Sequence, residues 1–195
     1  MTTVNKMKKK SKKAAPKRTK SFDKLVAYHE AGHAVMAYHK GGKFPSMHMD
    51  LSHLLPNVVA AVAPVKWPSG KGTERNEGLY RLAGRVVVEI LLKNPDEYKE
   101  NRNIDDLNKF CKLWKTKQER EKYFLELYLE SITFFKEPVI WKQVEIVAEY
   151  FLERRLLTYD DVELCIKSVE SKKRKKQLEF EKKAWGKIHH HRKSD

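Results

Sequence analysis

Apolar residues recur along most of this chain with the period of an α-helix. Between residues 77 and 93 they return every three or four positions, which places them on one face of a helix. The same period predicts further helices at about 22–40, 104–115, 119–135 and 138–155. Thr158 is expected to cap a last short helix, because a threonine side chain can accept a hydrogen bond from a first-turn amide.

Two short segments between the first two predicted helices have the pattern of strands. Met47–Leu51 alternates between apolar and polar residues, and Val58–Val65 is a short, mostly apolar run. Prolines and glycines surround both segments, and 66–76 is expected to be a polar loop. The whole pattern predicts a mainly helical (α+β) domain with a small β element.

Charge is unevenly distributed, which changes the meaning of a formal net charge of +15. Residues 1–20 hold +9 and residues 171–195 hold +7, so residues 21–170 have a net charge of −1. Basic segments with few apolar residues are expected to stay disordered. We therefore expect one neutral domain between two disordered basic tails. The tails could bind nucleic acid, an acidic partner or an anionic membrane surface.

The sequence also bears on the compartment. No run of about 20 apolar residues is present, so no transmembrane segment is expected. No apolar stretch follows the N-terminal charges, as a secretory signal would require. Cys111 and Cys165 lie far apart without CxxC spacing, which is typical of proteins in a reducing compartment. These features predict a cytoplasmic protein.

The pattern His-Glu-x-x-His stands inside the first predicted helix. Residues four apart share a helix face, so His29 and His33 project side by side. Two neutral imidazoles at that spacing can hold one zinc ion, and Glu30 would take a proton from a zinc-bound water. The pattern predicts a zinc metallopeptidase, with two solvated histidines on a surface helix as the alternative.

A catalytic zinc site needs a third protein ligand, and the residues alone leave several candidates. His39 has the offset of the extended metzincin motif, but Met36 stands where that motif has glycine. The helix is therefore expected to continue and to carry His39 about 280° around from His29. A glutamate on a second helix, either Glu77 or Glu89, could instead be the third ligand. Neither has the surrounding sequence pattern expected of such a ligand.

Asp105 and Asp106 are the remaining candidates, near the start of the helix predicted at 104–115. A carboxylate oxygen is a suitable zinc ligand. Acids in a first helical turn are also favoured by the positive end of the helix dipole, and spacing alone does not choose between the two interpretations. His48 and His53, in the strand region, are expected to face solvent.

Several segments together resemble the peptidase domain of the FtsH-type ATP-dependent zinc metalloproteases. Ala27–Val35 resembles the active-site helix of that family, and Leu82–Arg85, with Glu89, resembles its small-residue-Gly-Arg helix. Ile104–Leu107 resembles its Asn-Asp-Leu segment, and Trp141–Val162 is similar to its closing helices. The similarity keeps this order over nearly all of the predicted domain.

The resemblance implies that Asp106, which aligns with the family's ligand aspartate, completes a zinc site with His29 and His33. Asp105 stands where the family usually has asparagine. Family members carry an AAA+ ATPase and assemble as six-membered rings, but these 195 residues hold no Walker P-loop. The resemblance therefore implies a homo-oligomeric endopeptidase without its own ATPase, acting on flexible or unfolded polypeptides or beside a separate unfoldase.

Two other functions fit the same residues. A catalytically retired protease would keep zinc to stabilise an interaction domain, although such a domain has no need of Glu30. A nucleic-acid-binding protein would act through its basic tails, with zinc in a structural role. The histidines at 189–191 lie in a polar tail and are not expected to form a dedicated metal site.

Overall fold

The computed structural model describes residues 20–49, 60–70, 72–92 and 104–172. Its helices and strands are α1 (Lys20–His39), β1 (Ser46–Met49), β2 (Ala60–Val62), α2 (Thr73–Leu92), α3 (Ile104–Lys112), α4 (Lys117–Lys136), α5 (Pro138–Arg154) and β3 (Leu156–Thr158), followed by a helix over 159–172. The predicted fold class, mainly helical with a small β element, is confirmed. Nearly all of the two predicted basic tails lies outside the described residues, and so does His53.

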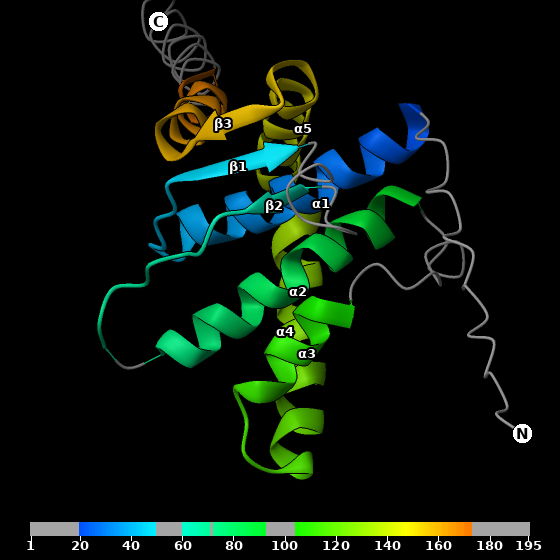
Figure 1. The fold of residues 1–195 in the computed structure, drawn as a ribbon, viewed down its shortest axis with the longest axis vertical. Helices are drawn as coiled ribbons and strands as arrows, with labels where there is room; N and C mark the ends of the chain where they lie inside the picture. Colours follow the sequence, from blue (N-terminus) through cyan, green and yellow to red (C-terminus); the bar gives the residue numbers. More distant parts are fainter. Residues whose placement is uncertain (1–19, 50–59, 71, 93–103, 173–195) are drawn as a thin grey trace, which may run out of the picture.

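Helix α1 lies at the centre of the fold. It packs against α2, α5, β1 and β2, with the sheet on one side and α2 to α4 on the other (Figure 1). From Ala27 to Ala37 every residue except His29 is buried. A helix that is apolar on most of its circumference is one that other elements surround, and this one carries the His-Glu-x-x-His pattern.

The contact between α1 and α2 is unusually close at Gly32. A Cβ atom at this position would lie 2.8 Å from the Val87 side chain and 2.9 Å from the carbonyl oxygen of Ala83. Only glycine therefore allows the two backbones to approach this far, and the approach brings the histidine face of α1 against α2.

The sheet has the strand order β2-β1-β3, and both pairs are antiparallel. Met47 lies between Val62 on one side and Leu157 on the other, and Met47 and Leu157 are fully buried. The two predicted strands are present, while β3 was not predicted. Its three residues follow α5 after the single residue Arg155 and are too few to show an alternating pattern.

The prediction of a polar loop over 66–76 is wrong for its last four residues. Helix α2 begins at Thr73, whose hydroxyl donates to the carbonyl of Gly70 at 2.9 Å. Arg75 then forms ion pairs with Glu126 and Glu130 on α4. This partly exposed first turn is polar because it is held by ion pairs and hydrogen bonds rather than by apolar contacts.

Capping residues mark two helix starts. Thr116 and Glu119 form a reciprocal capping box at the start of α4. The predicted cap at Thr158 is confirmed, because its hydroxyl accepts from the Asp161 amide while the Asp161 carboxylate accepts from the Thr158 amide. Within the described ranges, no helix has the length and apolar character needed to cross a membrane.

Replacing Gly32 by alanine is expected to destabilise the fold, since the Ala83 carbonyl cannot rotate away from a new Cβ atom. Overpacking destabilises the variant, while the better helix propensity of alanine offsets part of this cost. The expected net loss in unfolding free energy is about 1–2 kcal/mol. Urea unfolding measures this loss. Gly78→Ala is the matched control, because the one atom within 3.0 Å of its Cβ would be the end of the Leu127 side chain, with the Phe110 ring at 3.4 Å and no backbone atom in the contact. An equal or larger loss in the control would contradict the prediction.

Candidate metal centre

Two helices that are distant in sequence bring three possible metal ligands together. The Nε2 atoms of His29 and His33 on α1 lie 3.0 Å apart. Oδ2 of Asp106 on α3 lies 3.6 Å from the first nitrogen and 3.4 Å from the second. His33 is buried, and the other two are partly exposed. Three donor atoms that converge in this way can hold a metal ion.

The orientation of His33 is fixed from the back of its ring. Its Nδ1 lies 2.6 Å from the carbonyl oxygen of Tyr80 on α2. A carbonyl can only accept, so Nδ1 carries the hydrogen and Nε2 keeps its lone pair in the neutral ring. That lone pair is directed towards His29 and Asp106. A backbone carbonyl behind a ligating histidine is a recurrent support in metal sites.

The carboxylate of Asp106 is ionised in this setting. Burial alone would raise its pKa, but when the two imidazoles are protonated, the charge of His33 and hydrogen bonds from His29 and His33 outweigh burial and hold the pKa well below its usual range. Its second oxygen, Oδ1, lies 3.4 Å from Nη1 of Arg81 on α2. The site therefore combines one anion with two imidazoles, a donor set suited to a divalent cation.

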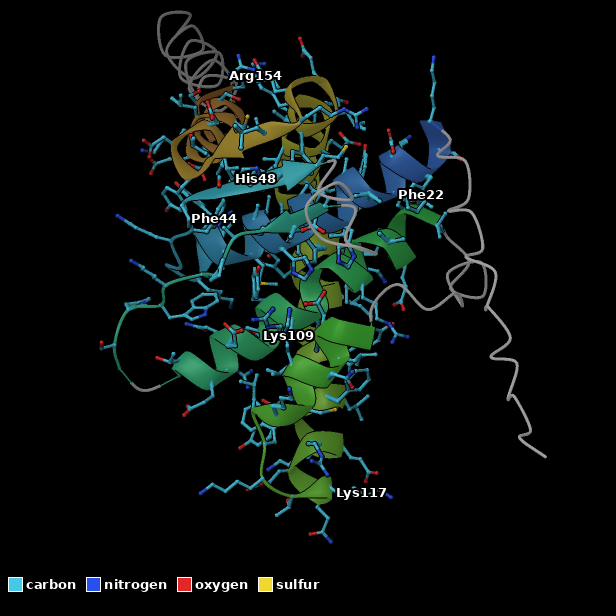
Figure 2. The ribbon with its side chains drawn as sticks, viewed as in Figure 1. Phe22, Phe44, His48, Lys109, Lys117 and Arg154 are labelled. Carbon is cyan, nitrogen blue, oxygen red and sulfur yellow. The ribbon has the colours of Figure 1, made fainter. Side chains whose placement is uncertain are left out.

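Glu30 lies beside this cluster in a less polar setting. The residue is 8% exposed, and its carboxylate accepts a hydrogen bond from the Val62 amide of β2 at 3.0 Å. Burial raises its pKa above the ordinary 4.5, outweighing the charge of His29 and the Val62 hydrogen bond, which lower it. Lys109 on α3, labelled in Figure 2, also lowers this pKa. The environment thus favours the protonated acid and makes Glu30 a stronger base when ionised.

Helix α2 leaves room for the two imidazoles at Gly84. A Cβ atom there would lie 2.6 Å from Cε1 of His29 and 2.6 Å from Nε2 of His33. Any side chain at this position would therefore displace both imidazole rings, including the Nε2 atom of His33. Gly84 belongs to the segment that carried the family resemblance, but the sequence assigned it no part in the site.

The other candidates for a third ligand lie elsewhere. His39 is exposed, and its Nε2 bonds to Oε1 of Gln143 at 2.7 Å; helix α1 continues through Met36, as predicted. Glu77 bonds to Trp67 and Arg81. Glu89 bonds to Arg85 and Tyr128. The side chain of Asp105 lies outside the described residues.

His48 and the two cysteines also stand apart from the cluster. His48 on β1, labelled in Figure 2, is half-buried rather than fully solvent-facing, and its Nε2 lies 2.7 Å from the Ser46 hydroxyl. Cys111 and Cys165 are free thiols, the first exposed and the second buried. Neither cysteine is a member of the ligand group.

Sequence reasoning missed three supports of the site. These are the Tyr80 carbonyl behind His33, the Val62 amide against Glu30 and the Arg81 guanidinium beside Asp106. The first two are backbone groups, which every residue type offers apart from the missing N–H of proline, so no sequence signal could have marked them. Arg81 does form an i,i+4 pair with Glu77, and that spacing is visible in the sequence.

Comparison with known proteins adds no family. No protein-family model matches the chain, and no curated protein matches it.

Replacing Gly84 by alanine is expected to weaken metal binding by about 10-fold or more, because the new methyl group would push both imidazoles out of position. Chelator competition with a divalent metal ion measures the affinity. Gly78→Ala on the same helix is the control and should bind as the parent does, since its neighbours belong to the core. Parent-like affinity in Gly84→Ala would show that the glycine is not needed.

Replacing Glu30 by glutamine is expected to stabilise the metal-free protein at neutral pH. The folded-state pKa of Glu30 is raised, so the stability that its protonated form contributes is complete below the unfolded pKa and is lost as pH rises through the folded pKa. Glutamine keeps an acceptor for the Val62 amide but cannot ionise. Urea unfolding in chelator should give stabilities that coincide near pH 4 and diverge above it. Parallel curves across this range would contradict the assigned shift.

Proposed function

We propose that this chain is a zinc-dependent endopeptidase that hydrolyses flexible or unfolded polypeptides. The observation that carries the proposal is the convergence of two imidazole nitrogens and one carboxylate oxygen beside a buried carboxylate, Glu30. Two histidines and one acid leave a fourth position open for water on a tetrahedral ion, as catalytic zinc sites require. A purely structural site would have four protein ligands.

The donor spacing supports zinc. Ligand atoms at 2.0–2.1 Å from a tetrahedral centre lie about 3.3 Å from one another. The three pairs formed by His29, His33 and Asp106 are separated by 3.0, 3.4 and 3.6 Å, so little movement would be needed. When bound, the ion would lower the pKa of a coordinated water towards about 7 and would polarise a peptide carbonyl.

Glu30 would act as the proton acceptor and later as the proton donor. Its raised pKa brings the carboxylate closer to the working pH, where a group can both take and return a proton. The Val62 amide holds Oε2 and so limits rotation of the carboxylate. In this role Glu30 would take a proton from the attacking water and pass it to the leaving amine.

The position of β2 supports a polypeptide substrate in an extended form. Strand β2 is at one edge of the described sheet, and its Val62 amide contacts Glu30. An edge strand can pair with an extended peptide through main-chain hydrogen bonds. A peptide paired there would run past the metal centre, and only a flexible or unfolded segment can adopt that form.

The resemblance to FtsH-type peptidases extends this proposal. It implies a homo-hexamer, while the cytoplasmic location rests on the two cysteines without CxxC spacing. These 195 residues hold no P-loop, so they would not unfold a folded substrate by themselves and would act on flexible segments or beside an unfoldase. The rival interpretation is a retired protease that keeps its metal and no longer cleaves. A burial cost at Glu30 without catalytic benefit argues against that rival.

Replacing Glu30 by glutamine is expected to lower cleavage of a labelled unfolded polypeptide by about 10²-fold or more, since the proton acceptor is lost. Zinc content, measured by elemental analysis, should stay near that of the parent. Asp106→Ala should lose most of the zinc and all cleavage, because it removes a ligand.

Glu153→Gln serves as the matched control, because Glu153 is an exposed glutamate on α5 and its variant should cleave as the parent does. Zinc without any cleavage in the parent would favour the retired protease. Cleavage that survives in Glu30→Gln would point to a contaminating protease and would contradict the proposal.

A further inference from the structure

We infer that Arg81, anchored by Glu77, is a positioning residue that directs one oxygen of Asp106 at the histidine pair. The inference rests on the proposed metal centre and concerns how its third ligand is held. It assigns a role to three linked side chains on α2 and the segment before it. Neither the motif nor the family resemblance includes this role.

The two oxygens of Asp106 have different partners. Oδ2 faces the imidazoles, at 3.4 Å from His33 and 3.6 Å from His29. Oδ1 faces away and lies 3.4 Å from Nη1 of Arg81. A carboxylate whose second oxygen is paired with a guanidinium offers its first oxygen alone, so the arrangement favours ligation through a single oxygen. Without Arg81, rotation about the last side-chain bond would let either oxygen turn towards the metal position.

Arg81 is itself held in place. Its Nε donates to Oε1 of Glu77 at 2.7 Å, and Nη2 lies 2.5 Å from the same oxygen. The other oxygen of Glu77 accepts from the indole N–H of Trp67. A planar guanidinium bound in this way by Nε and Nη2 projects Nη1 in a fixed direction. The hydrogen-bonded series of side chains therefore runs from Trp67 through Glu77 and Arg81 to Asp106.

One turn of α2 supports two ligands at once. The carbonyl of Tyr80 fixes the ring of His33, and the next residue, Arg81, contacts Asp106. The guanidinium also lies 5.1 Å from the centre of the Tyr80 ring. Adjacent residues on a well-packed helix thus fix the position of one ligand from α1, His33, relative to one ligand from α3, Asp106.

Charge alone would give the opposite effect on metal binding. A cation beside a ligand repels a second cation, so an isolated arginine would weaken the site. Here the Glu77 carboxylate accompanies Arg81, and the pair is close to neutral. The net contribution expected of Arg81 is therefore orientation of Asp106, and partners of this kind change metal affinity by about 10–100-fold when removed.

Helix α2 provides its own matched control. Arg85 lies one turn after Arg81 and pairs with Glu89 in the same i,i+4 manner, with Nε donating to Oε1 at 2.7 Å. Glu89 also accepts from the Tyr128 hydroxyl. This pair has the same chemistry and similar exposure, but its contacts are with α4 rather than with a ligand of the metal centre.

The test is chelator competition on the full chain with zinc, together with absorption spectra of the cobalt(II) form. Arg81→Met should weaken zinc binding by about 10-fold or more and should change the cobalt bands, which report the ligand geometry. Arg81→Lys should stay weakened, because an ammonium group lacks the fork that joins Glu77 to Asp106. Glu77→Gln should be weakened as well, and Arg85→Met should match the parent.

The inference is overturned if Arg81→Met and Arg81→Lys bind zinc as tightly as the parent with unchanged cobalt bands. It is also overturned if Arg85→Met is weakened equally, since the effect would then be general destabilisation of α2. A parent that binds no zinc would remove the metal centre and the inference together. A parent that binds zinc and does not cleave, with Arg81→Met still weakened, would overturn the peptidase and leave the inference standing.

Discussion

The close contact between α1 and α2 is the constraint on which the rest of this structure depends. Gly32 lets the two helix backbones meet, and Gly84 leaves the space that the imidazoles fill. One residue without a side chain on each helix therefore sets both the packing and the site. Once the helices are at this distance, the carbonyl of Tyr80 reaches His33. The contact between α1 and α2 therefore determines both the packing of the core and the placement of the possible ligands.

Polar groups inside this contact are tolerated because each has a defined partner. His33 bonds to a carbonyl, Glu30 to an amide of β2, and Asp106 to the imidazoles and to Arg81. Buried polar atoms without partners cost stability, and burial raises the pKa of Glu30 above its ordinary value even with the hydrogen bond from Val62. A protein that needed only a stable core would place apolar residues here. The buried carboxylate of Glu30 is the feature on which the proposed catalytic role depends.

Local periodicity was sufficient to predict most of the helices, both early strands and the pairing of His29 with His33, because these follow from spacing within one element. The choice of Asp106 needed the family resemblance, since spacing cannot say where α3 docks. Arg81 and the Tyr80 carbonyl escaped prediction because their roles exist only after α1, α2 and α3 have packed. The short strand β3 was not predicted, because three residues are too few to show an alternating pattern.

The ligands come from helices far apart along the chain, α1 and α3, and this has a consequence for the chain as a polymer. An ion held by His29, His33 and Asp106 would act as a cross-link that closes a long loop, which reduces the freedom of the unfolded chain in the way a disulfide does. Both cysteines are free thiols, so no disulfide supplies that closure. Folding of this protein would then be tied by mass action to the concentration of free metal around it.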